Sequence, residues 1–174
     1  MMDEMVLAAL AKWPNVPAVF GWLRLDARGQ WWIKDARMQH EGMVEFFNRN
    51  YSRDGQGRCY VQNGPQKVYV QLDAAPLAAR RTPKGWSTVP YDDDLPARAA
   101  WLTPDGMLLL EIGGELAVVD DRDLAAVLEE ALPDWDGDAA TLPAVLKVGD
   151  AGLPLAAETL PALQARYGIV ARPR

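Results

Sequence analysis

Residues 19–34 read VFGWLRLDARGQWWIK, and this stretch decides how the fold is interpreted. Residues 19–25 alternate as a strand does, and residues 30–34 form a second strand. Between them, Asp26-Ala27-Arg28-Gly29 is a turn whose glycine can supply a positive φ. The stretch therefore predicts a β-hairpin near the start of the chain.

The rest of the chain continues with short strands and short helices separated by turn residues. The expected elements are helix 3–13, helix 41–50, strands 58–62, 67–73, 77–81, 98–103, 107–112 and 115–119, helix 122–132, strand 144–148, and a helix from about 158 to 167. Asp120 or Asp121 can cap the helix over 122–132. We therefore expect an α+β fold with antiparallel sheets and short packing helices.

A unit of strand, turn, strand and helix recurs along the chain. Gly29 and Gly106 lie in corresponding turns, and the pairs Trp22-Leu23 and Trp101-Leu102 precede them. A third, weaker copy can be drawn from residue 144 onward. The pattern predicts repeated strand-turn-strand-helix units, although any α+β protein contains such pieces and the spacing is uneven. Duplication and chance resemblance both stay open.

The charge is divided unevenly between the two halves of the chain. Residues 1–84 carry 12 Lys/Arg and 8 Asp/Glu, whereas residues 85–174 carry 6 and 16, and together they give the net charge of −6. The irregular segment 83–96 separates the two halves. We expect an N-terminal α+β subdomain over 1–84, mildly basic, and an acidic C-terminal α+β subdomain over 85–174, of complementary charge.

The rare residues exclude much chemistry. Cys59 is the single cysteine and His40 the single histidine, so neither an internal disulfide nor a structural zinc site is expected. His40 precedes a helix and is expected to be solvated or capping, and Cys59 is expected to be buried in a strand. No stretch has the 18 apolar residues of a membrane span, and the acidic start differs from a secretory signal. We therefore expect a cytoplasmic protein without membrane contact.

Candidate metal and nucleotide motifs are incomplete. The run Asp134-Trp135-Asp136-Gly137-Asp138 begins like a calcium loop, but Ala139 and Val145 stand where glycine and glutamate are required. Asp92-Asp93-Asp94 is interpreted as solvated. Gly55-Gln56-Gly57 and Gly113-Gly114 lack the context of a phosphate-binding loop. We therefore name no catalytic, cofactor-binding or metal residues and expect no cofactor.

Basic and aromatic residues alternate in the first half, as in proteins that bind single-stranded nucleic acid. The basic residues are Arg49, Arg53, Arg58, Lys67, Arg80, Arg81 and Lys84, and the aromatic residues are Tyr51, Tyr60 and Tyr69. The overall acidity opposes attraction to phosphate, so nucleic acid is not the favoured partner. Trp31 and Trp32 point to opposite faces of one strand, and the outer one could line a peptide or ligand groove.

Three stretches together resemble an uncharacterised bacterial family of domains of unknown function. They are residues 25–34 (LDARGQWWIK), 43–47 (MVEFF) and 65–77 (PQKVYVQLDAAPL), within a resemblance that covers mainly residues 20–80. The resemblance implies an α+β fold with repeated motifs and a suggested role in signal transduction. It implies no catalytic residues.

The sequence favours a non-catalytic binding or regulatory module, with an unidentified protein, peptide or small molecule as its partner. One alternative is an enzyme that uses only carboxylates, arginines or lysines. The other is a protein that binds single-stranded nucleic acid through the basic first half.

Overall fold

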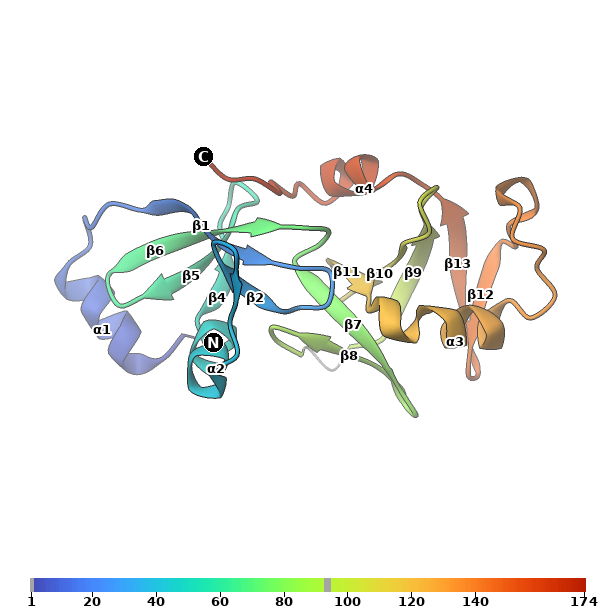
Figure 1. Cartoon of the computed structure of the whole chain (residues 1–174), viewed down its shortest axis with the longest axis horizontal. Coiled ribbons are helices and arrows are strands. Elements are labelled where there is room, and N and C mark those ends of the chain that lie inside the picture. Colours follow the sequence, from blue (N-terminus) through green and yellow to red (C-terminus); the bar gives the residue numbers. More distant parts are fainter. Residues whose placement is uncertain (1, 93–94) are drawn as a thin grey trace.

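The computed structural model describes residues 2–92 and 95–174, whose strands form two sheets (Figure 1). The first sheet has the order β3-β2-β1-β6-β5-β4 and the second the order β12-β13-β9-β10-β11-β7-β8. The strands are β1 (Val19–Leu25), β2 (Trp31–Ile33), β3 (Ala36–Arg37), β4 (Tyr51–Arg53), β5 (Cys59–Asn63), β6 (Gln66–Leu72), β7 (Leu77–Thr82), β8 (Gly85–Val89), β9 (Ala97–Leu102), β10 (Leu108–Ile112), β11 (Glu115–Val119), β12 (Val145–Val148) and β13 (Ala151–Ala157). The helices are α1 (Glu4–Lys12), α2 (Glu41–Arg49), α3 (Asp121–Ala131), α4 (Leu160–Arg166) and a 3-10 turn (Ala139–Thr141).

The α+β class is confirmed, but the sheets are mixed rather than purely antiparallel. The parallel neighbours are β1 with β6, β7 with β11, and β9 with β13. The pairs β1–β6 and β9–β13 arise because the hairpins β5–β6 and β12–β13 return to the sheet after a helix, and their second strands then run in the same direction as β1 and β9. A long return connection of this kind is what parallel pairing requires.

The two sheets share one pattern of connection and pairing. Each has a three-stranded meander, then a helix, then a hairpin whose second strand runs parallel to the first meander strand. The first sheet has β4 in addition, and the second sheet has β7 and β8. Leu25 faces Leu72 in the first sheet, and Leu102 faces Ala157 in the second. The segment from residue 144 onward, drawn from the sequence as a possible third unit, therefore completes the second sheet instead.

The corresponding turns are built in the same way. The Gly29 nitrogen donates to the Asp26 carbonyl at 3.0 Å, and the Gly106 nitrogen donates to the Thr103 carbonyl at 3.0 Å. Both glycines have positive φ, at 73° and 89°. The side-chain oxygen of Asp26 or Thr103 also accepts from the backbone at the start of the next strand. Local turn chemistry therefore favours the observed register of the β1–β2 and β9–β10 hairpins.

The core has two parts that lie on opposite faces of the second sheet. Leu109 packs with the first sheet and with α4, whereas its neighbours Leu108 and Leu110 pack beneath α3. This alternation follows from the strand geometry, which sends successive side chains to opposite faces. The second sheet therefore contributes buried side chains to both parts of the core.

The C-terminal segment returns from the second sheet to the first (Figure 1). Leu163 of α4 is fully buried in the core that both sheets share. Beyond α4, the Ala171 carbonyl accepts a hydrogen bond from the Leu72 nitrogen at 2.8 Å. The chain passes from the first sheet to the second between Leu72, the end of β6, and Leu77, the start of β7. The division into subdomains at 84/85 stays a prediction.

Ion pairs join the two halves of the chain. The Arg28 Nε lies 2.7 Å from the Asp121 Oδ1, and the Arg53 Nη1 lies 2.7 Å from the Glu115 Oε1. In both pairs the cation comes from the first half and the carboxylate from the second. Among the described residues, no helix has the length and hydropathy needed to cross a membrane.

Candidate functional site

An apolar cavity of about 530 Å³, here called the α2 groove, lies between α2 and the first sheet. Val61 and Val68 belong to its sheet wall, and Phe46 belongs to its helix wall. Trp22 and Met43 also line it and are 50% and 41% exposed. Large apolar side chains that remain this exposed in a concave site are typical of a surface that receives a ligand or partner.

Local sequence explains why these side chains face the groove. Phe47 anchors α2 in the core, where its ring meets the Trp31 ring edge-on at 5.5 Å, and this leaves Met43 one helical turn earlier at the groove. In β1 the pairing register shifts between Val19 and Leu23. Trp22 lies within this irregularity, directly after Gly21, whose φ is +78°.

The chemistry of the α2 groove is that of a binding surface. None of its described lining residues is ionisable, and its polar side chains are the amides of Asn63 and Gln66. Amide groups can orient a ligand through hydrogen bonds, but proton transfer at a reacting centre requires a group with a suitable pKa. The groove can therefore hold an apolar body and orient it.

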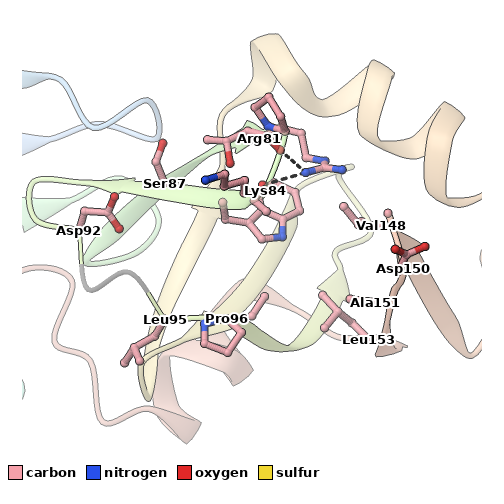
Figure 2. A pocket seen from close by; sticks show the side chains of 16 residues that line it. Arg81, Lys84, Ser87, Asp92, Leu95, Pro96, Val148, Asp150, Ala151 and Leu153 are labelled. Carbon is pink, nitrogen blue, oxygen red and sulfur yellow. Dashed lines mark hydrogen bonds between the residues drawn. The ribbon is translucent and has the colours of Figure 1, made fainter.

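A second cavity of about 710 Å³, here called the hairpin pocket, lies on the second sheet (Figure 2). Its walls are the β7–β8 turn, the β12–β13 turn and residues 95–97. Trp86, Leu95 and Leu153 give it apolar surface, and Lys84 and Asp150 add charge. Its lining is thus more polar than that of the α2 groove.

His40 and Cys59 have the structural roles expected from the sequence. The His40 Nδ1 accepts a hydrogen bond from the Met43 nitrogen at 3.2 Å and so caps α2. Cys59 is fully buried, and burial raises the pKa of its thiol to about 12. A thiol with so high a pKa is protonated near neutral pH and is a poor nucleophile.

The two adjacent tryptophans do lie on opposite faces, but neither lines the α2 groove. Trp31 is buried and its Nε1 donates to the Asn48 Oδ1 at 2.8 Å. Trp32 is half-buried, with the Arg24 guanidinium 4.6 Å from its ring centroid. The tryptophan at the groove is Trp22, which sequence reasoning missed. Gly21, which interrupts the alternation of the strand, was the available signal for an irregularity there.

Most of the basic residues singled out from the sequence are paired with carboxylates. The pairs are Arg49–Asp3, Arg53–Glu115, Arg58–Asp54, Arg80–Asp123 and Arg81–Glu130. Tyr51 is buried, and its hydroxyl donates to the Pro76 carbonyl at 2.8 Å. Tyr60 and Tyr69 are also buried and lie beneath Lys67 and Arg58, respectively. The structure therefore does not gather these residues into an open basic track.

The acidic motifs lie apart from the α2 groove. The Asp136 Oδ1 accepts from the Thr141 Oγ1 at 2.6 Å, which lowers the pKa of Asp136, so this carboxylate serves its own loop. Asp92 lines the hairpin pocket, while Asp93 and Asp94 lie outside the described residues. Within residues 2–92 and 95–174, no three metal-ligating side chains converge.

Comparison with known proteins gives a family and a related fold. No functionally curated protein matches the chain. A DUF1285 family protein from Silicibacter pomeroyi DSS-3 has a similar solved structure, with a TM-score of 0.50 and 15% identity over 94% of this chain and 100% of that one. One from Shewanella baltica OS155 has a TM-score of 0.45 and 16% identity over 62% of this chain and 91% of that one. The DUF2944 family model, described as "Protein of unknown function (DUF2946)", matches residues 2–174, and the chain therefore belongs to this family.

Proposed function

We propose that the protein is a non-catalytic binding module and that the α2 groove holds an apolar side chain or small apolar ligand. The observation that carries the proposal is the exposure of Trp22 and Met43 inside a concave, largely apolar cavity. Burying these two side chains against a ligand would remove apolar surface from water, which is the main driving force of such binding. A cytoplasmic location and a role in signalling remain predictions from the sequence.

The carboxylates favour binding over catalysis. A hydrolytic acid pair needs one carboxyl group with a raised pKa beside one with a normal or lowered pKa. Among the described residues, each carboxylate with a resolved shift has a lowered pKa; these are Asp3, Asp54, Asp120, Asp123, Glu130 and Asp136. None of these six lines the α2 groove. Their pairing with arginines or backbone groups supports structural roles.

The ion pairs also disfavour a nucleic-acid partner. An arginine that already pairs with a carboxylate gives less attraction to phosphate, because the two charges largely cancel at a distance. Five of the seven basic residues singled out from the sequence are paired in this way. This pairing supports a partner that is recognised by apolar contact.

The test uses the dye 8-anilinonaphthalene-1-sulfonate, whose fluorescence rises in apolar sites. Met43→Glu puts a charge into the α2 groove, and we expect it to weaken dye binding about tenfold, since an unpaired charge in an apolar site is unfavourable. Met5→Glu is the matched control, because Met5 is 85% exposed on α1 and is not part of the groove lining.

Equal dye binding by Met43→Glu and the wild type would refute the α2 groove as the site. Thermal unfolding of both variants checks that the fold is kept. Turnover of a substrate by the purified protein alone would overturn the non-catalytic part of the proposal.

A further inference from the structure

A small charged cavity adjoins the α2 groove at Trp22. This cavity, here called the Lys34 pocket, has a volume of about 210 Å³ and shares Trp22 and Leu23 with the groove as lining residues. Its described lining carries two cations, Lys34 and Arg24, against one carboxylate, Asp35. The apolar groove therefore has a site with an excess of positive charge beside it.

Lys34 is held against Trp22 by two contacts. Its ammonium nitrogen lies 4.5 Å from the centroid of the Trp22 ring, and its backbone nitrogen donates to the Trp22 carbonyl at 3.0 Å. Lys34 also directly follows Ile33, which lines the groove. These contacts place the charge at the boundary between the Lys34 pocket and the α2 groove.

The backbone of Lys34 has a conformation that favours glycine. In the part of the chain that the structure describes, it is the one non-glycine residue with a positive φ, 54°. It lies in the two-residue turn between β2 and β3, because Ile33 pairs with Ala36, and glycine or asparagine is usual in such turns. Backbone strain of this kind clusters at ligand-binding sites, which makes the Lys34 side chain a candidate for binding.

The charge of Lys34 is available to an anionic ligand, whereas that of Arg24 is not. Arg24 pairs with Asp73, but no ion pair among the described residues includes Lys34, which is exposed. Glu41 and Glu45 of α2 do not line the groove. The ammonium group has three N–H donors, so contact with one aromatic ring leaves donors for an anionic oxygen.

We propose, building on the proposed function of the α2 groove, that its ligand is a small apolar acid, a molecule with an alkyl or aromatic body and one carboxylate. The groove holds the body, and Lys34 binds the carboxylate in the adjoining pocket. A groove of about 530 Å³ has the size of a small-molecule site, which is typically about 300–1,000 Å³.

Two dyes that differ by one anionic group test the role of Lys34. 8-Anilinonaphthalene-1-sulfonate carries a sulfonate, and N-phenyl-1-naphthylamine has the same aromatic body without it. Lys34→Met should weaken binding of the anionic dye about fivefold and leave binding of the uncharged dye unchanged, since it removes one partly exposed charge-assisted contact. Lys34→Arg, which keeps the charge, should retain the wild-type affinity for both dyes.

Decanoate and 1-decanol extend the test to a carboxylate and its uncharged counterpart. Decanoate should displace N-phenyl-1-naphthylamine about fivefold less effectively from Lys34→Met than from the wild type, whereas 1-decanol should displace it equally from both. Lys67→Met is the matched control and should behave as the wild type. The Lys67 ammonium nitrogen lies 4.7 Å from the centroid of the Tyr60 ring, but neither residue lines the groove or the Lys34 pocket.

Equal affinity of Lys34→Met and the wild type for either the anionic dye or decanoate would overturn the role of Lys34. So would weaker binding of the uncharged dye by Lys34→Met, because the substitution would then act on the Trp22 wall and not through a charge. Met43→Glu should weaken binding of the uncharged dye about tenfold whether or not Lys34 binds the acid. Unchanged binding of the uncharged dye by Met43→Glu would refute the groove itself, so the two failures are distinguishable.

Discussion

Replacing Gly57 with alanine tests how firmly the C-terminal segment is fixed to the first sheet. Gly57 has a φ of +84°, where alanine costs about 1–2 kcal/mol. A Cβ there would also lie 1.7 Å from the Gly168 carbonyl oxygen, far inside the 3.0 Å that real Cβ contacts respect. The backbone of the C-terminal segment must therefore move away.

That movement should break contacts that depend on the segment. The Val170 nitrogen donates to the Gly57 carbonyl at 2.9 Å, and this bond contributes about 1 kcal/mol. Ile169 is buried next to it, and its exposure costs about 2 kcal/mol. When the cost of the backbone conformation is added to these two losses, the free energy of unfolding should fall by about 4–5 kcal/mol. Urea denaturation measures this change.

Gly137→Ala provides the comparison. Gly137 has almost the same φ, +86°, but a Cβ there would meet nothing within 4 Å. Gly137→Ala should therefore lower the free energy of unfolding by only about 1–2 kcal/mol, which the backbone conformation costs. If Gly57→Ala is no more destabilising than Gly137→Ala, the close approach to Gly168 does not hold the segment and the reasoning is wrong. Limited proteolysis beyond α4 should be faster only in Gly57→Ala.

Three further predictions concern buried or half-buried polar groups. Arg53→Met should destabilise the protein by about 2–3 kcal/mol because it leaves the Glu115 carboxylate unpaired, and a double-mutant cycle with Glu115→Gln should recover part of the loss. Cys59 should resist a thiol reagent at pH 8 until the protein unfolds. Because burial raises the pKa of this thiol to about 12, the folded state keeps a proton that the unfolded state loses near pH 9. Stability should therefore fall above pH 9, with a smaller slope between pH 9 and 10 in Cys59→Ala. Burial opposes charge on Asp120, but hydrogen bonds from Arg122 outweigh it and lower the pKa of Asp120. The contribution of ionised Asp120 to the free energy of unfolding is therefore present at neutral pH and is lost as the pH falls below about 4. Asp120→Asn should cost about 1–2 kcal/mol at pH 7 and less at pH 3 in denaturant titrations.

The elements that sequence reasoning located have strong local patterns. β1 spans Val19–Leu25 as predicted, and the turn after Leu25 specifies where it ends. The cap of α3 is Asp120, whose side chain accepts from the Arg122 nitrogen. In contrast, β8 lies within the segment 83–96 that was expected to be irregular, and its hydrogen bonds to β7 define it. A short edge strand of this kind depends on its partner more than on its own sequence.

β13 is a second strand that depends on its neighbours more than on its own sequence. No strand is predicted from the sequence between residues 148 and 158, and the glycine, proline and alanine residues of β13 are poor strand formers. The strand exists because β9 and β12 lie on either side of it. The α2 groove could not be predicted from the sequence either, because Trp22 and Met43 come together only when α2 is placed over the sheet.

The return of the C-terminal segment has a consequence for the order of folding. Leu72 pairs with Ala171, and these residues are separated by about 100 positions, so the ribosome releases Leu72 long before its partner. Until then, the first sheet lacks the contacts of Ile169 and carries exposed apolar surface that other chains can reach. Long-range closure of this kind also slows folding, because the loop must form before its contacts stabilise it. A nascent chain is therefore most prone to aggregation while the second sheet is still being synthesised.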